Sequence, residues 1–169
     1  MAGLAHAAVG LAAKPLVPKV NVGWLILGTY MLDILWIAFW GVGLEIWPAK
    51  PGAHPLWWDH SLLMAVVWSV FFGLLASWLG RRSRYRTRIG IVFGLMVFSH
   101  WVLDWITHPM TALASHDTGI PLAFGNSPLV GLGFYRSLTV VWVTEIGGFL
   151  AGLAIYIVWR VRRKAQEFG

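Results

Sequence analysis

The stretch IGIVFGLMVFSHWVLDWITH, residues 89–108, decides the fold. It is mostly apolar, and a helix of about 20 apolar residues crosses the hydrocarbon core of a bilayer. It also carries His100, Asp104 and His108, which lie four residues apart and so share one helical face. Ionisable groups inside a membrane are costly, about 2.5–3.5 kcal/mol each, and usually face a bundle interior. The stretch therefore predicts a membrane-spanning helix whose polar face looks into a helix bundle.

Three further apolar stretches are long enough to span, at about residues 22–42, 60–79 and 137–159. A shorter apolar segment, residues 2–13, precedes them and is expected to pack on the bundle as a half-helix or interfacial helix. The sequence predicts an all-α polytopic membrane protein with four transmembrane helices plus a short N-terminal half-helix. Residues 1–169 would form a single integral membrane domain.

Composition agrees with this prediction. Hydrophobic residues make up 58% of the chain and charged residues 12%, whereas soluble domains have about 25% charged residues. This composition disfavours a soluble globule, a disordered chain, a coiled coil and collagen. Cysteine is absent, which excludes disulfides, thiolate metal sites and cysteine nucleophiles. Glycines four residues apart, Gly90–Gly94 and Gly148–Gly152, permit close packing of helices.

Basic residues predict the orientation. Eleven of the 13 fall on one side of the predicted spans: Lys14, Lys19, Arg81, Arg82, Arg84, Arg86, Arg88, Arg160, Arg162, Arg163 and Lys164. Lys50 and Arg136 fall on the other side. The positive-inside rule makes the first side cytoplasmic and places both termini there, in a multi-pass protein. The net charge of +6 therefore does not indicate a nucleic-acid-binding surface. Membrane lipids are the expected contacts, and the sequence leaves an oligomer or partner subunits open.

Buried acidic residues indicate a metal site. Asp33, Asp104 and Glu145 fall inside predicted spans, with no Lys or Arg deep enough to pair with them. Asp33 and His100 lie at a similar depth, about 16 Å from the basic side. Unpaired carboxylates need protons or a cation, and imidazole with carboxylate suits zinc, iron or manganese. The sequence therefore predicts a buried site for a divalent metal, with zinc favoured.

Histidines complete the candidate ligands. His60 opens the second span, and His6 reaches the same level if its helix dips into the bundle. The candidate metal ligands are His6, Asp33, His60, His100, Asp104 and His108. Simpler roles remain open: Asp33 could bond Thr29 or Tyr30, and Glu145 could bond Thr144 or a neighbouring helix. Asp59 could cap the second span, and His108 could be an interfacial loop residue. His54 and His116 are expected in two outer loops, at about residues 43–59 and 109–136.

The order of several short motifs resembles a known family. The motifs are His6 in an Ala/Gly-rich segment, Leu32-Asp33, Asp59-His60-Ser61, Ser99-His100 followed by Asp104, and Thr107-His108-Pro109. Together they resemble the bacterial inner-membrane metal-dependent hydrolases whose best-known branch is LexA-regulated. The resemblance implies a bacterial inner-membrane location, a four-helix membrane protein and a buried metal site. By motif matching, it implies metal ligands at His6, Asp33, His60, His100 and Asp104.

The chain departs from that branch at two positions. Trp36 stands where the branch has a second acidic residue, and Pro55 follows His54 where the branch has an arginine. Glu145 or His108 would have to compensate. A sister branch with Ser-His-Ser-Leu and Asp-x-x-x-His-Pro motifs is more similar.

The leading hypothesis is a metal-dependent membrane hydrolase acting on a lipid ester or phosphoester. Glu145 would be its general base, or a partner of a ligating histidine. One alternative is a non-enzymatic membrane subunit or a transporter that handles protons or cations through its buried acids. A second alternative is a b-type haem carrier, which is disfavoured because the candidate histidines each lie near an aspartate that haem does not need.

Overall fold

The computed structural model describes residues 3–45 and 57–168. The helices found there are α1 (Leu4–Ala12), α2 (Val22–Thr29), α3 (Met31–Gly41), α4 (Leu62–Leu79), α5 (Arg86–Thr107) and α6 (Leu138–Phe168). Two 3-10 helices, η1 (Lys14–Leu16) and η2 (Phe134–Arg136), and an antiparallel pair of short strands, β1 (Ile120–Pro121) and β2 (Leu129–Val130), complete the described elements. Lys50, His54 and Pro55 lie outside the described residues, as does most of the first predicted outer loop.

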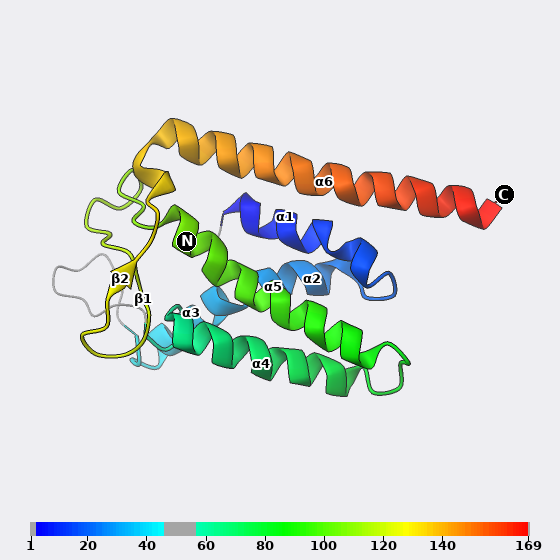
Figure 1. The fold of residues 1–169 in the computed structure, drawn as a ribbon, viewed down its shortest axis with the longest axis horizontal. Helices are drawn as coiled ribbons and strands as arrows, with labels where there is room; N and C mark the ends of the chain where they lie inside the picture. The colour runs from blue at the N-terminus through cyan, green and yellow to red at the C-terminus, as the bar shows by residue number, and fades with distance from the viewer. Residues whose placement is uncertain (1–2, 46–56, 169) are drawn as a thin grey trace.

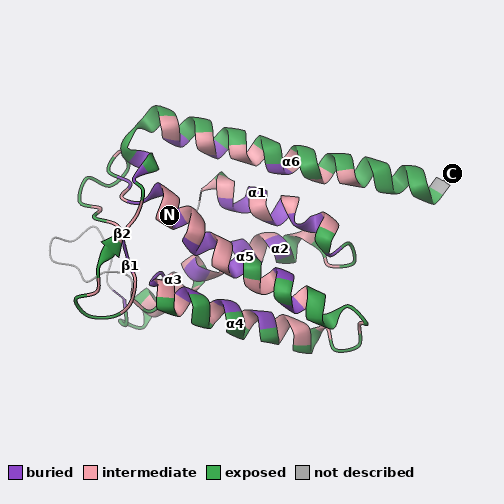
Figure 2. Ribbon diagram, in the orientation of Figure 1, coloured by how far each residue is buried: buried purple, intermediate pink, exposed green. Residues whose placement is uncertain are grey.

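The helices suit a lipid environment. α4, α5 and α6 are each long and apolar enough to cross a membrane, and α2 with α3 passes the same test as one broken span. The apolar windows of α4 and α6 are only 17% and 11% buried, and Figure 2 shows much of their surface exposed. In lipid such apolar faces need no protein cover. The protein is an all-α polytopic membrane protein, which confirms the predicted fold class.

The first span is not the continuous helix expected over residues 22–42. α2 ends at Thr29, α3 begins at Met31, and the two helices are bent by 56°. At the break, the Tyr30 hydroxyl donates to the Gly3 carbonyl at 2.9 Å. The Thr29 carbonyl accepts a hydrogen bond from His100 Nδ1 at 2.7 Å. Because the last carbonyls of a helix have no partner inside it, ending α2 here makes the Thr29 carbonyl available to His100.

Other helix ends also differ from the expectation. α4 begins at Leu62, and His60 lies before it, because the Ser61 hydroxyl caps the helix by accepting from the Met64 amide at 3.2 Å. α6 continues to Phe168, beyond the expected end at residue 159. α1 lies between α6 and α2, so the short first helix does dip into the bundle (Figure 1).

Small residues let the helices pack at backbone contact. A Cβ atom added at Gly90 of α5 would lie 2.6 Å from the Gly73 carbonyl oxygen of α4. At Gly152 of α6 it would lie 2.5 Å from the Ala8 carbonyl oxygen of α1. Both distances are shorter than any normal carbon–oxygen contact. The close packing predicted from the glycine spacing is therefore confirmed at both interfaces.

The second outer loop closes one end of the bundle. Ile120 of β1 is fully buried against Leu32, Val97 and Trp101. The loop is tied down by backbone hydrogen bonds to α4 and α5, among them Leu132 N–H to the Trp105 carbonyl at 2.8 Å. Figure 1 shows the β1–β2 hairpin at the end of the bundle opposite the C-terminal end of α6.

Candidate metal centre

Five ionisable side chains from four segments meet inside the bundle. They are His6 of α1, Asp33 of α3, His60 before α4, and His100 and Asp104 of α5. Four of them are buried, with exposures of 3% or less, and the Asp33 side chain is 15% exposed. These segments are far apart in the sequence, and the dip of α1, the break after α2 and the cap of α4 bring them together.

The spacing of the ligand atoms suits a small metal ion. His100 Nε2 lies 3.2 Å from His60 Nε2, 3.3 Å from Asp104 Oδ2 and 3.7 Å from Asp33 Oδ1. His60 Nε2 lies 3.4 Å from Asp33 Oδ1 and 3.5 Å from Asp104 Oδ2. A tetrahedral ion bound at about 2.0–2.2 Å holds its ligand atoms about 3.3–3.6 Å apart. The separations around His60 Nε2 and His100 Nε2 are close to this range.

His6 extends the cluster through the other oxygen of Asp104. His6 Nε2 lies 3.5 Å from Asp104 Oδ1, and its ring centroid lies 4.3 Å from that of His100. Two groups could each hold an ion: His6 with His100 and Asp104, and Asp33 with His60 and His100. Because Asp104 offers one oxygen to His6 and the other to His60 and His100, the cluster could serve one ion or two adjacent ions.

Hydrogen bonds orient two of the imidazole rings. His100 Nδ1 bonds the Thr29 carbonyl, which can only accept, so this nitrogen carries a proton. His60 Nδ1 lies 2.6 Å from Asp59 Oδ1, where it donates to the carboxylate. In the neutral rings both Nε2 atoms are then unprotonated and face each other. Two such lone pairs at 3.2 Å repel unless a proton or a cation lies between them.

Several atoms of the cluster have no hydrogen bond within the described residues. They are both ring nitrogens of His6, both carboxylate oxygens of Asp104, and Oδ2 of Asp33. Buried polar atoms are nearly always hydrogen-bonded, because leaving one without a partner costs about 1–3 kcal/mol. A bound cation would satisfy the Asp104 carboxylate and one ring nitrogen of His6. A metal site therefore explains these unpaired atoms better than a set of separate structural histidines does.

Glu145 lies outside this cluster. Its Oε2 accepts from the Ala5 amide of α1 at 2.8 Å, and its Oε1 accepts from the Tyr135 hydroxyl. A Cβ at Gly3 would meet the Glu145 carboxylate, so the close contact needs a glycine there. Glu145 thus fastens the N-terminal end of the helix that carries His6. A general-base role for Glu145 stays a prediction.

His108 and His116 also lie apart from the five ligand candidates. His108 Nδ1 lies 2.8 Å from Asp117 Oδ2, in the loop that closes the bundle. Asp117 also accepts from the Gly119 amide at 3.0 Å, and the neighbouring His108 holds the pKa of the Asp117 carboxyl below its usual range, against the opposing effect of burial. His116 is exposed. The structure gives His108 a loop-fastening contact, and its assignment as a metal ligand stays a prediction.

The sequence does not predict the roles of two residues that orient the ligands, Asp59 and Thr29. Asp59 does not cap α4: the Ser61 hydroxyl caps this helix, and the buried Asp59 instead accepts a hydrogen bond from His60. Its position next to a ligating histidine was the available signal. Thr29 acts through its backbone carbonyl, which no side-chain pattern could reveal.

No family model, curated protein or solved structure matches this chain.

Proposed function

We propose that this protein is a metal-dependent membrane hydrolase. The observation that carries the proposal is the pair of oriented imidazoles, His60 and His100, whose Nε2 atoms lie 3.2 Å apart beside Asp33 and Asp104. The shell contains only nitrogen and oxygen donors, which suits zinc, manganese or iron, and zinc is the ion we favour. When bound, such an ion would acidify a water molecule and polarise an ester or phosphoester bond.

Residues next to the metal ligands would hold these ligands in position. Asp59 and the Thr29 carbonyl fix the ring orientation of His60 and His100, which raises ligand basicity as well as order. Glu145 holds the start of α1 and so the position of His6. The partial exposure of Asp33 marks the side of the cluster where water and substrate could enter.

The position of the site suggests the substrate class. The cluster lies among apolar helices that could span a membrane, and His60 and Asp104 lie near the helix ends that are hydrogen-bonded to the hairpin loop. A lipid phosphoester or carboxylic ester could bring its headgroup to this depth while its acyl chains stay in the bilayer. The resemblance to bacterial inner-membrane metal-dependent hydrolases supports the same reaction and location, with the basic end of the molecule in the cytoplasm.

Bound metal is the first quantity to measure. The chain would be purified in mild detergent without a histidine tag, and metals would be counted by mass spectrometry for the wild type, His100→Ala and Asp104→Ala. Asp117→Asn is the matched control, because Asp117 also pairs with a histidine but lies outside the cluster. We expect at least one zinc, manganese or iron per chain, lost in both cluster variants and kept in the control. Hydrolysis of lipid esters and phosphoesters would then be compared across the same samples.

A folded, metal-free wild type would overturn the proposal and favour the proton- or cation-handling alternative, since Asp33, Asp59 and Asp104 would then share protons with the histidines. A visible spectrum of the same sample tests the haem alternative. The structure disfavours it, because the two Nε2 atoms at 3.2 Å leave no room for a porphyrin between them.

A further inference from the structure

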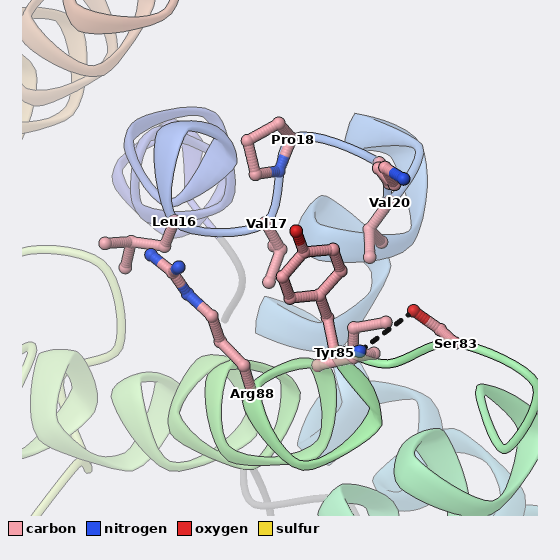
Figure 3. Close-up of a pocket in the computed structure, with 9 residues that line it drawn as sticks. Leu16, Val17, Pro18, Val20, Ser83, Tyr85 and Arg88 are labelled. Atoms are coloured by element: carbon pink, nitrogen blue, oxygen red, sulfur yellow. Dashed lines mark hydrogen bonds between the residues drawn. The ribbon is translucent and has the colours of Figure 1, made fainter.

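A second feature lies at the opposite end of the bundle from the metal centre. A cavity of about 190 Å³ opens between the turn that follows η1 and the beginning of α5. Its polar lining comes from Lys19, Ser83, Tyr85 and Arg88. Figure 3 shows the Arg88 side chain rising from α5 towards Leu16, with the Tyr85 ring beside it. The cavity is independent of the proposed hydrolase site.

The charge around this cavity is positive and uncompensated. Lys19 Nζ lies 5.6 Å from the centroid of the Tyr85 ring, and the Arg84 guanidinium lies 4.6 Å from it. All seven acidic residues lie in the described part of the chain, and Glu167 is the one at this end, where it pairs with Arg163 at 3.1 Å. An anion is the natural complement of such a surface.

The wall of the cavity is itself built on a buried cation. Lys14 is 9% exposed, and its ammonium donates to the Pro18 carbonyl at 2.9 Å and to the Val20 carbonyl. Arg163 reaches the Pro18 carbonyl as well, at 3.4 Å. Burial, and then the positive charge of Arg163, lower the pKa of Lys14 below its usual value. A nearby negative charge would relieve this repulsion.

The remaining lining is apolar and lies beside the turn that joins two candidate membrane spans. Leu16, Val17 and Ile89 contribute to it. α4 ends at Leu79 and α5 begins at Arg86, so the cavity opens where two membrane-spanning helices leave the hydrocarbon. A soluble phosphate would use the cationic groups alone, whereas a phospholipid would also place its glycerol and first acyl carbons on the apolar wall.

We propose that this cavity binds an anionic phospholipid, with its phosphate held by Lys19 and Arg88. Basic residues near a membrane surface attract anionic lipids, and here a shaped cavity with an apolar wall adds selectivity for one bound molecule. The lipid would stabilise the turn between η1 and α2 against α5.

Native mass spectrometry of the full chain in neutral detergent tests this assignment. Equimolar phosphatidylglycerol and phosphatidylcholine would be added to the wild type, to Lys19→Gln with Arg88→Gln, and to Arg82→Gln with Arg162→Gln. The last pair removes the same charge from exposed residues of the basic end that do not line the cavity. We expect one phosphatidylglycerol retained about tenfold more than phosphatidylcholine in the wild type and control, and near parity in the cavity variant. Arg88→Lys keeps the charge and should keep the preference.

Three results would overturn the proposal. Equal retention of the two lipids by the wild type would show that the cavity does not select an anion. An equal loss in the control pair would show diffuse attraction instead of a site. Displacement of phosphatidylglycerol by an equal concentration of glycerol 3-phosphate would show that the ligand is a soluble phosphate. Melting temperatures measured without lipid check that all variants are folded.

Discussion

At the scale of single residues, the metal centre depends on atoms that are not themselves ligands. Asp59 is fully buried, and its Oδ1 atom accepts a hydrogen bond from His60 Nδ1. Such a carboxylate fixes the ring and its tautomer, and removing one typically weakens metal binding about 10- to 100-fold. The effect of changing Asp59 on metal binding therefore distinguishes a metal centre from a histidine cluster with only a structural role.

Asp59→Asn should weaken metal affinity by about 10- to 100-fold while leaving the fold intact, because the amide oxygen is a poorer acceptor of the same shape. Competition against a chelator measures the affinity. Asp117→Asn changes an equivalent His–Asp pair outside the cluster and should leave the affinity unchanged. Equal affinities for wild type and Asp59→Asn would remove Asp59 from the site.

The buried Glu45, which follows α3, should make the stability of the folded protein depend on pH. It is 5% exposed, and its Oε1 accepts from the Trp58 amide at 2.6 Å. Burial raises the pKa of Glu45 from 4.5 to about 7. The folded state therefore keeps a proton that the unfolded chain releases above pH 4.5, so stability falls as the pH rises from about 4.5 to 7.

Glu45→Gln should remove this loss of stability, about 1–3 kcal/mol across that window. Thermal melting in detergent at a series of pH values measures it, with the difference between wild type and variant isolating Glu45 from other titrating groups. A variant with the same pH profile as the wild type would show that Glu45 ionises normally in the folded protein.

At the scale of helices, the α4–α5 pair fixes the depth of His100 and Asp104. Gly90→Ala places a Cβ atom 2.6 Å from the Gly73 carbonyl oxygen, so backbone must move. Overpacking of this kind costs about 1–3 kcal/mol, and metal affinity should fall with stability because the ligands on α5 shift. Melting temperature and metal content are the readouts.

Gly147→Ala is the matched control for that change. Gly147 is exposed on α6, and its added Cβ meets nothing within 4 Å. Alanine should leave stability unchanged or raise it by about 0.5–1 kcal/mol, as expected in a helix interior. A Gly90→Ala protein as stable as Gly147→Ala would show that the α4–α5 contact is looser than the structure has it.

Sequence periodicity could predict the helices but not the break at Thr29 and Tyr30. The apolar run continues through these residues without a proline, so its length indicates one span. The break depends on tertiary contacts, the Tyr30 hydroxyl to Gly3 and His100 to the Thr29 carbonyl, which join residues 27 and 71 positions apart. The i, i+4 spacing of His100 and Asp104 was visible locally. The contact of Glu145 with Ala5, 140 residues away, was not.

At the scale of the whole molecule, charge is segregated along the bundle. The buried carboxylates of the metal centre lie towards the hairpin end, whereas the basic residues gather where α4 ends, α5 begins and α6 terminates. Both proposed sites follow from this segregation: one collects carboxylates and imidazoles for a cation, and the other collects basic groups for a lipid phosphate. An asymmetry of this kind also determines which way a membrane protein inserts.

The orientation predicted from it can be measured because the chain has no cysteine. Two single cysteines would be introduced, Ala114→Cys in the exposed loop between α5 and α6 and Gln166→Cys near the C-terminal end of α6. At about 1.5 Å per residue, α6 is long enough to reach the opposite membrane surface. In intact bacterial cells, a membrane-impermeant maleimide should label position 114 and spare position 166; permeabilised cells should label both. Labelling of 166 alone would place the basic end outside. Substrate would then reach the metal centre from the cytoplasmic leaflet, and the lipid cavity would face the outer one.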